Sequence, residues 1–263
     1  MRYDQIKLIA CDLDGTLLLN GAQSLQPETC GLIRRLKDEK GILFCAASGR
    51  QYTNLQRLFA PVKDDIAYIC ENGCLVYYQG RRIRKEVMDY ALGQELLKAV
   101  METEGAEALL TGERVHYVQP KDIAYFYHMR DVVRNDVIQV PDILDTPEEY
   151  MKVSLYEKGG LHDIEKWKER FGNRCTVVTG GGEWLDMMPR GVNKASGLRS
   201  LLEVLQIGPE EVMAIGDNDN DLEMLEFVGT PVAVYTARPA VRAAAEIETD
   251  TVENLFRKLL SER

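Results

Sequence analysis

The chain has 263 residues, which is enough for one large domain or two modest ones. Hydrophobic residues make up 45% of it and charged residues 28%, so we expect a soluble globular protein with a full core. The net charge of −10 disfavours DNA, RNA and anionic membranes as partners. No apolar stretch approaches the roughly 18 residues of a membrane-spanning helix, so no membrane association is expected.

The first predicted element is the apolar run Ile6–Cys11, which is typical of a buried parallel strand. Asp12 and Asp14 follow it directly, and Gly15 and Thr16 come next. Open α/β sheets place their ligands at the carboxyl ends of their strands, so both carboxylates are candidates for chemistry. Two carboxylates at this spacing, followed by Gly-Thr, indicate a nucleophile beside a proton-transfer group and a hard metal ion.

Helices and strands then alternate with short loops over the first third of the chain. The predicted elements are a helix over Pro27–Lys40, a strand over Ile42–Ala47, a helix over Tyr52–Phe59 and a strand over Ile66–Cys70. The first of these strands ends at Ser48, Gly49 and Arg50, and the second ends at a loop containing Asn72. This alternation predicts an α/β fold with a doubly wound parallel sheet.

The pattern changes in the middle of the chain, where hairpin signals replace the alternation. The predicted elements there are a hairpin over Leu109–Val118, helices near Gln94–Glu104 and Leu161–Phe171, and strands over Met151–Glu157 and Cys175–Thr179. We expect residues 81–186 to form an inserted α+β domain, and residues 1–80 and 187–263 to form the core. Gly80 and residues 189–191 are the predicted hinge regions.

The core pattern resumes after the insert. The predicted elements are a helix over Lys194–Leu205, a strand over Val212–Ile215, a helix near Asp221–Phe227, a strand over Pro231–Val234 and a helix near Val252–Leu260. The strand over Val212–Ile215 leads into a second acidic loop that contains Asp217 and Asp221. Together with Asp12 and Asp14, these carboxylates could surround one magnesium ion, which prefers oxygen ligands.

Two other metals are excluded by spacing and composition. A calcium loop that began at Asp217 would need Gly at its sixth position and Glu at its twelfth, but Leu222 and Val228 stand there. The chain has three histidines, and no second pair of cysteines complements Cys70 and Cys74, so a zinc site is not expected. Cys11, Cys45 and Cys70 lie in strand-like runs and are interpreted as small buried residues, and the expected compartment is the reducing cytoplasm. No signal peptide is expected before the first strand.

Four motifs occur in the order found in the haloacid dehalogenase (HAD) superfamily. They are Asp12-x-Asp14-Gly15-Thr16, Ser48-Gly49-Arg50, Lys194, and Gly216-Asp217-x-x-Asn220-Asp221. The inserted segment and the tail make the chain most similar to the Cof-like phosphatases, and the resemblance covers essentially the whole chain. It implies a Rossmann-like core with a large inserted α/β cap domain.

The resemblance also implies roles for individual residues. Asp12 would be the nucleophile that forms an aspartyl-phosphate, and Asp14 would protonate the leaving oxygen and later activate water. Magnesium would be held by Asp12, Asp217, Asp221 and the backbone carbonyl of Asp14. Its charge would shield the repulsion between a carboxylate and a phosphate.

Four further residues are implied as phosphate ligands: the hydroxyl of Ser48, the amide of Gly49, the ammonium of Lys194, and Asn220. Arg50 and Asn72 lie on loops that face the cap in the Cof-like pattern, and both are possible substrate contacts. For Arg50 the alternative is an ion pair with a nearby Asp.

The chain departs from the family after its last predicted core strand. Relatives have a Gly-Asn-Ala turn there, whereas this chain has Tyr235 and Arg238 in place of small residues. We expect these two side chains near the mouth of the site, where they would alter substrate preference and the openness of the pocket.

The function expected from the residues and the resemblance is a magnesium-dependent phosphatase. Its substrates would be small cytosolic metabolites such as sugar phosphates, and the protein would be a monomer or weak homo-oligomer. Two alternatives stay open. One is a phosphomutase of the same superfamily, and the other is a metabolite-binding protein whose catalytic site is retired.

Overall fold

The structure is a computed structural model that describes residues 3–261, and this part of the chain divides into two compact units. Unit 1 contains the residues up to Arg50, then Leu55–Arg84, and then the residues from Asn193 onward. Unit 2 contains Gln51–Asn54 and Lys85–Val192. The structure therefore divides the chain after residues 84 and 192, whereas the sequence analysis predicted divisions after residues 80 and 186.

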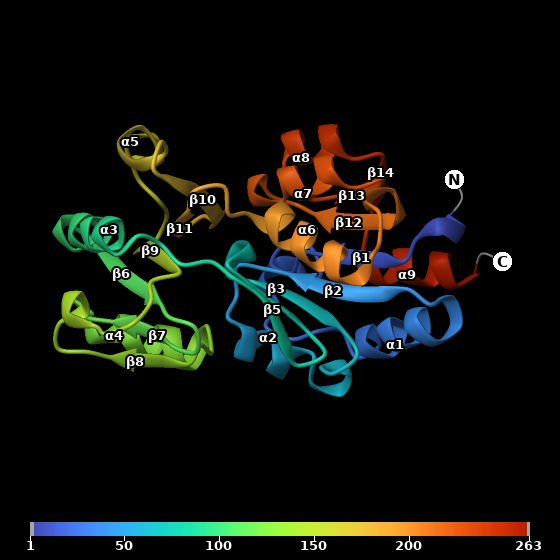
Figure 1. The fold of residues 1–263 in the computed structure, drawn as a ribbon, viewed down its shortest axis with the longest axis horizontal. Coiled ribbons are helices and arrows are strands. Elements are labelled where there is room, and N and C mark those ends of the chain that lie inside the picture. The colour runs from blue at the N-terminus through green and yellow to red at the C-terminus, as the bar shows by residue number, and fades with distance from the viewer. Residues whose placement is uncertain (1–2, 262–263) are drawn as a thin grey trace. The chain divides into compact units, whose positions relative to one another are not determined.

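Unit 1 is built on a sheet of eight strands among the described residues (Figure 1). The strands are β1 (Leu8–Cys11), β2 (Leu43–Ala47), β3 (Ala67–Cys70), β4 (Leu75–Tyr78), β5 (Arg81–Lys85), β12 (Val212–Gly216), β13 (Thr230–Val234) and β14 (Ile247–Thr249). Their order is β14-β13-β12-β1-β2-β3-β4-β5, and the pairs from β14 to β3 are parallel. The predicted α/β fold with a parallel, doubly wound sheet is confirmed.

The helices of unit 1 pack along this sheet. They are α1 (Thr29–Lys40), α6 (Lys194–Leu205), α7 (Leu222–Phe227), α8 (Pro239–Ala244) and α9 (Val252–Ser261), together with α2 (Tyr52–Leu58), whose residues up to Asn54 belong to unit 2. Helix α6 contacts α7, which contacts α8, while α1 packs against α9. Buried Leu32, Ile33 and Leu36 form the inner face of α1, as their spacing predicted, and Gly41 ends the helix in the left-handed conformation.

Strand β1 occupies the centre of the sheet, between β2 and β12. All four of its residues are buried, and Leu8 pairs with Val212 on one side and with Leu43 on the other. A strand that is covered on both faces has a continuous run of apolar residues, and this is why β1 could be predicted from the sequence. The position of β1 places the residues that follow it at the middle of the carboxyl edge of the sheet.

The hinge predicted at Gly80 is wrong. Gln79 and Gly80 form the turn between β4 and β5, with φ angles of 49° and 69°. Two successive residues with positive φ are typical of a tight β-hairpin turn. The sequence analysis missed β5 because Arg81–Lys85 has basic residues at four of its five positions and no apolar alternation.

Unit 2 is built on a second sheet, of six strands among the described residues. The strands are β6 (Ala106–Thr111), β7 (His116–Val118), β8 (Val137–Gln139), β9 (Lys152–Glu157), β10 (Cys175–Gly181) and β11 (Trp184–Pro189), in the order β10-β11-β9-β6-β7-β8. The helices are α3 (Tyr90–Glu102), α4 (Ile123–Tyr127) and α5 (Ile164–Phe171). The predicted hairpin over residues 109–118 is confirmed, because β6 and β7 pair antiparallel.

The two faces of the second sheet differ in what covers them. On one face, Val153 and Leu155 of β9 belong to an apolar cluster with residues of α3 and α5. On the other face, Leu109 and Tyr156 pack in a smaller apolar cluster with Tyr125 of α4. The smaller cluster covers only part of its face, and polar side chains occupy the rest.

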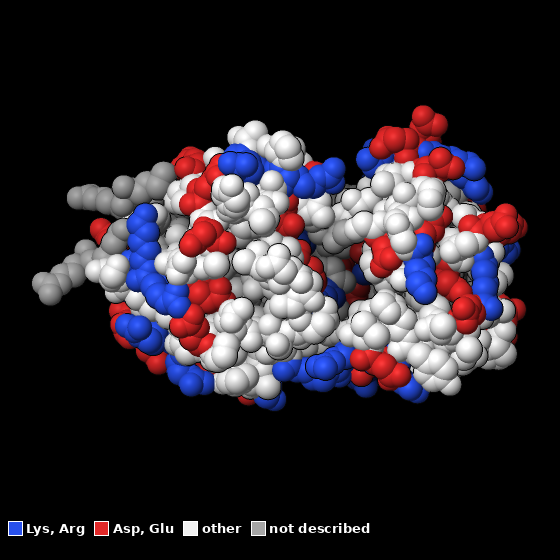
Figure 2. All heavy atoms as spheres, turned by 180° about the vertical axis from the view of Figure 1, so that it is seen from behind, with Lys and Arg blue, Asp and Glu red and all other residues white. Residues whose placement is uncertain are grey.

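The surface carries both acidic and basic side chains (Figure 2). Acidic and basic side chains are interspersed on the face drawn in Figure 2. Between residues 3 and 261, no helix is both long enough and apolar enough to cross a membrane. Cys11, Cys45 and Cys70 are buried free thiols, as predicted.

The contact between Gly73 and α6 generates a test of the fold of unit 1. Gly73 has a φ of +103°, and a Cβ atom added to it would lie 2.2 Å from the carbonyl oxygen of Asn193. Gly41 has a φ of +70° but open space around a Cβ atom. Gly41→Ala should therefore lower the free energy of unfolding by roughly 1–2 kcal/mol, the cost of the left-handed conformation alone.

Gly73→Ala should lower the free energy of unfolding clearly more than its matched control Gly41→Ala does, because the backbone of Asn193 must also move. Denaturant unfolding of both variants measures the difference. Equal losses of stability would show that α6 does not pack this closely against residue 73.

Candidate active site

Asp12 stands at the end of the central strand. Its amide donates a hydrogen bond to the carbonyl oxygen of Ile215 at 2.9 Å, so the ladder between β1 and β12 continues to this residue. Asp12 is 5% exposed. The backbone of the sheet therefore fixes this carboxylate in a largely water-excluded position.

The turn after Asp12 brings the two acidic loops together. Gly15 has a φ of +93°, and its amide donates to the carbonyl of Leu18 at 3.1 Å. A Cβ atom on Gly15 would lie 2.3 Å from Oδ2 of Asp217, so only glycine fits. The hydroxyl of Thr16 donates to Oδ1 of Asp217 at 2.9 Å. The Gly-Thr pair thus seats the second loop against the first.

The second acidic loop is organised around Asp221. Its Oδ2 accepts hydrogen bonds from the amides of Asp217 and Asn218 at 3.0 and 3.1 Å. Asp221 is fully buried, and a Cβ atom on Gly216 would lie 2.5 Å from the Cβ atom of Asp221. The loop therefore closes on itself and turns Oδ1 of Asp221 towards the end of β1.

Lys194 joins the two loops. It is the first residue of α6, whose start is fixed by a capping box between Asn193 and Ser196. Its ammonium is fully buried and lies 2.5 Å from Oδ1 of Asp12 and 2.6 Å from Oδ1 of Asp221. Burial lowers the pKa of Lys194, but the two carboxylates raise it further, so the net shift is upward and the lysine stays charged.

The charges of this cluster do not balance. Asp12, Asp217 and Asp221 contribute three carboxylates, and Lys194 contributes one ammonium. Burial raises the pKa of Asp12, and the charge of Asp221 raises it further in spite of Lys194. The pKa of Asp217 is raised for the same two reasons. A divalent cation would restore the balance.

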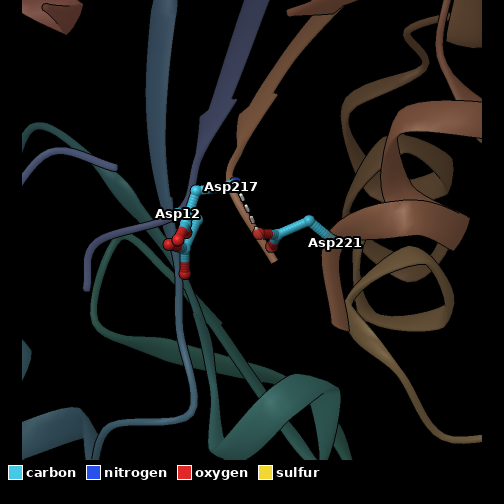
Figure 3. Close-up of side chains that lie close together, drawn as sticks. All are labelled: Asp12, Asp217 and Asp221. Carbon is cyan, nitrogen blue, oxygen red and sulfur yellow. Dashed lines mark hydrogen bonds between the residues drawn. The ribbon is translucent and has the colours of Figure 1, made fainter. Parts of the chain in front are cut away.

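The three carboxylates fit a magnesium ion. Asp12, Asp217 and Asp221 each offer an oxygen atom, and these atoms all lie within 4.8 Å of one another (Figure 3). A set of ligands made only of oxygen, with room left for water, is what magnesium prefers. The Asp14 side chain is not part of this group, and its backbone carbonyl is the atom that the resemblance implies as a ligand.

Arg50 forms an ion pair with Asp14. The Nε and Nη2 atoms of Arg50 lie 2.8 and 2.5 Å from the Oδ2 and Oδ1 atoms of Asp14, which is a bidentate geometry. The side chain of Asp14 is 46% exposed and that of Arg50 is 15% exposed. Of the two alternatives left open for Arg50, the structure contains the ion pair with a nearby Asp. This pair orients the carboxylate of Asp14 beside the turn.

The remaining predicted phosphate ligands lie on adjacent loops of unit 1. Ser48 follows β2 and is buried, and its Oγ atom accepts the amide of Arg50 at 3.2 Å. Asn72 has a φ of 54° and donates its amide to the carbonyl of Ser48 at 3.0 Å. The side-chain amide of Asn220 donates to Oδ1 of Asn72 at 3.3 Å. Hydrogen bonds thus connect the loops after β2, β3 and β12.

Gly49 is constrained by the loop after β3, because a Cβ atom on it would lie 3.1 Å from Nδ2 of Asn72.

The sequence analysis did not identify Glu71, the residue before Asn72, as a candidate functional residue. Glu71 is 1% exposed and has a φ of 48°. A buried carboxylate with a strained backbone is a candidate functional group. The sequence did not reveal it, because Glu-Asn-Gly after a strand is also typical of an ordinary turn.

Of the two residues that follow β13 in place of small ones, Arg238 contacts the second acidic loop and Tyr235 does not. The side chain of Tyr235 is 68% exposed, and the guanidinium of Arg242 lies 5.7 Å from the centre of its ring. Arg238 donates its amide to the carbonyl of Asp217 at 2.9 Å and pairs with Asp219 at 2.7 Å. Arg238 therefore braces the second acidic loop, a contact that could not be inferred from its position after a strand.

The structure places an acidic cluster at the carboxyl edge of a doubly wound α/β sheet, and the comparisons specify the family. The sequence matches the haloacid dehalogenase-like hydrolases over residues 9–254. It is 31% identical over 257 residues to the 5-amino-6-(5-phospho-D-ribitylamino)uracil phosphatase of Escherichia coli, covering 92% of this chain and 89% of that protein.

Solved structures have the same fold. A structure from Eubacterium rectale has a TM-score of 0.84 at 28% identity and covers 98% of this chain and 99% of its own. A HAD subclass IIB sugar phosphatase has a TM-score of 0.80 at 22% identity and covers 96% and 98%. The chain belongs to the haloacid dehalogenase-like hydrolases, and the predicted class of enzyme, a phosphatase of that superfamily, is confirmed.

The acidic cluster generates a test that does not depend on activity. Magnesium should raise the melting temperature of the wild-type protein, since a ligand present at 100 times its Kd stabilises the folded state by about 2.7 kcal/mol. Asp217→Asn should abolish most of this shift. Asp219→Asn is the matched control, because Asp219 lies in the same loop but pairs with Arg238 at the surface. The assignment fails if the two variants lose the shift equally.

Proposed function

We propose that the protein is a magnesium-dependent phosphatase that hydrolyses small phosphate monoesters through an aspartyl-phosphate on Asp12. The observation that carries the proposal is the setting of Asp12, which is buried at the end of β1 with one oxygen bonded to Lys194 and two more carboxylates beside it. A carboxylate held in this way keeps its other oxygen for attack on phosphorus.

The first half of the reaction forms a bond between a carboxylate oxygen of Asp12 and phosphorus, and it breaks the bond from phosphorus to the ester oxygen. Asp14 donates a proton to that leaving oxygen. In the second half, Asp14 accepts a proton from water as the water attacks phosphorus. The bond to Asp12 breaks, and inorganic phosphate leaves. In the structure both oxygens of Asp14 accept hydrogen bonds from Arg50, so one of these two bonds would open when Asp14 carries the proton, and the other would keep the side chain in place.

The phosphoryl oxygens would be bound by three donors: the hydroxyl of Ser48, the amide of Gly49 and the ammonium of Lys194. Asn220 would assist from the second acidic loop. Asp12, Asp217 and Asp221 would hold magnesium, and when bound it supplies positive charge against the negative charge of the phosphate. Preorganised donors in a water-excluded site lower the barrier more than the same groups in water.

The proposal extends to the substrate class and to unit 2. The related enzyme from Escherichia coli is named for a small phosphorylated ribityl compound, which supports a small metabolite as substrate here. We infer that residues 81–186 act as a cap that limits the size of the substrate. Separately packed units joined by short connections generally move relative to each other, and closure of a lid excludes water. The reaction would take place in the cytoplasm, where the buried thiols stay reduced.

Asp12→Asn and Asp14→Asn should fail at different steps. Asp12→Asn should neither turn over nor become phosphorylated, since an amide is a poor nucleophile. Asp14→Asn should lose roughly 10²–10⁴ in steady-state rate. With a good leaving group such as dinitrophenolate, it should still release about one equivalent of product in a burst, because only the second step then needs a base.

Rapid-quench measurement of the burst and mass spectrometry of the quenched protein test this assignment. Asp219→Asn serves as the control for loss of an acidic side chain. Turnover by Asp12→Asn at a rate near that of the wild type would refute the mechanism. Strong activation of the wild type by a hexose bisphosphate, with little release of phosphate, would indicate a phosphomutase instead.

A further inference from the structure

Unit 1 contains a cavity that the proposed mechanism does not use. It lies between the segment that follows the first acidic loop (residues 12–16) and the start of α9, and all of its lining residues belong to unit 1. We use the name α9 cavity for it. Its volume is about 270 Å³. A water molecule occupies about 30 Å³ in the liquid, so the α9 cavity has room for a ligand of roughly nine heavy atoms.

A buried carboxylate lines the α9 cavity. Glu253 lies in the first turn of α9 and is 6% exposed. Its Oε1 atom accepts a hydrogen bond from the hydroxyl of Thr29 at 2.5 Å. Within residues 3–261, Glu253 has no other side-chain hydrogen bond and no ion pair. The second oxygen of this carboxylate, Oε2, is therefore left without a protein partner in the described part of the chain.

Packing alone does not explain the burial of Glu253. A carboxylate that leaves water without a cationic partner loses much of its hydration energy, and glutamate is rarely buried unless it is paired. The partial positive charge at the start of α9 offsets part of this cost. That effect is available to an exposed carboxylate as well, so it does not require burial. Since buried polar groups nearly always have partners, the unpaired oxygen beside a cavity indicates a ligand.

The other charged side chains of the α9 cavity are paired with each other. Arg257, one turn after Glu253 on α9, forms an ion pair with Glu28 and also donates to the side-chain carbonyl of Asn254. Arg257 and Glu28 cancel in charge, so the lining keeps the single negative charge of Glu253. A cationic ligand would be attracted to this charge, and an anionic ligand would be repelled by it.

The remaining lining narrows the class of cation. Leu17 and Leu19 provide apolar surface, and Ser24 and Gln26 provide a hydroxyl and an amide that can each donate and accept hydrogen bonds. A metal ion of this charge class needs several oxygen ligands around it, whereas Glu253 is the one carboxylate of the lining that is not in an ion pair. An ammonium group on a short carbon skeleton with hydroxyl groups matches both parts of the lining.

We propose that the α9 cavity is a second ligand site, which binds a small hydroxylated primary amine in its ammonium form through Glu253. The site is connected to the first acidic loop by a short stretch of chain. Leu17 lines the cavity and directly follows Thr16, whose hydroxyl donates to Asp217. The amide of Leu18 donates to the carbonyl of Leu13 at 2.7 Å, which closes this stretch into a turn. A ligand packed against Leu17 therefore favours the conformation in which Thr16 contacts Asp217.

Three probes of similar shape and different charge test the site: tris(hydroxymethyl)aminomethane, pentaerythritol and bis(hydroxymethyl)propionate. At neutral pH the first is a cation, the second is uncharged and the third is an anion. In ligand-observed NMR titrations of the metal-free full chain, the amine should bind at least roughly tenfold more tightly than the other two, which corresponds to about 1.4 kcal/mol. Equal affinity for the three probes, preference for the anion, or no binding of the amine would overturn the assignment.

Glu253→Gln tests the carboxylate itself. Glutamine keeps a carbonyl oxygen for the hydroxyl of Thr29 and removes the charge, so the variant should fold and bind the amine roughly tenfold more weakly. Glu248→Gln is the matched control, because it removes an exposed carboxylate that pairs with Arg242 and should leave the affinity unchanged. Equal losses of affinity in the two variants would contradict the role of Glu253.

A second variant keeps the proposal testable if Glu253→Gln does not fold. Ala22 is a half-buried residue of the lining, and Ala22→Phe places a large side chain in the α9 cavity without touching Glu253. The variant should lose binding of the amine. Undiminished binding by a folded Ala22→Phe protein would show that the amine binds elsewhere, which would overturn the proposal.

Turnover of para-nitrophenyl phosphate tests the connection to the first acidic loop, and this part rests on the phosphatase function proposed above. A saturating concentration of the amine should raise kcat/KM about fivefold in the wild type and in Glu248→Gln, and should have no effect in Glu253→Gln. Pentaerythritol controls for the effect of the solvent. An unchanged kcat/KM in a wild-type protein that binds the amine would overturn the connection. Absence of any turnover by the wild type would instead refute the phosphatase function, while the binding results would still decide the site.

Discussion

The ammonium of Lys194 is buried between the carboxylates of Asp12 and Asp221, and this interaction sets the positions of three distant chain segments. The two pairs join residues that are 182 and 27 positions apart in the sequence. Removing one partner from such a contact leaves a buried uncompensated charge, which costs several kcal/mol. The end of β1, the start of α6 and the loop after β12 are therefore fixed as one group, and Gly15, Thr16 and Gly216 supply the close approaches that this group requires.

This constraint also fixes where the chain must return from unit 2. Lys194 follows Val192, the last residue of that unit, by two positions. The capping box of Asn193 sets the first turn of α6, and the carbonyl of Asn193 packs against Gly73. The insertion can therefore vary in length and composition only between its fixed points of exit and return.

Most of the core of unit 1 could be predicted because its strands are continuous apolar runs and its helices carry clear end signals. The helix over Lys194–Leu205 was predicted with the bounds that the structure has. The hairpin of β4 and β5 was missed because β5 lies at the sheet edge and carries basic side chains, so its strand character comes from pairing and not from its own sequence.

The candidate site, like the fold, could be predicted only in part. Motif order identified Asp12, Lys194, Asp217 and Asp221, and the structure brings these four together. An ion pair with a nearby Asp was one of the two alternatives for Arg50, but which Asp it would be, and the partner of Arg238, could not be predicted, because an arginine near several carboxylates pairs with the one that the backbone presents at the right angle. Those two side chains bind Asp14 and Asp219, so both arginines act on the acidic loops.

The position of β1 between β2 and β12 has a consequence for the synthesis of the protein. Strand β1 is made first, but one of its two neighbours begins only at Val212. At ribosomal speeds of about 5–20 residues per second, the intervening chain takes roughly 10–40 seconds to appear. During that time a wholly apolar strand has an unpaired edge, the feature that recruits other chains into aggregates. Until the last third of the chain emerges, β1 can pair only on its β2 side.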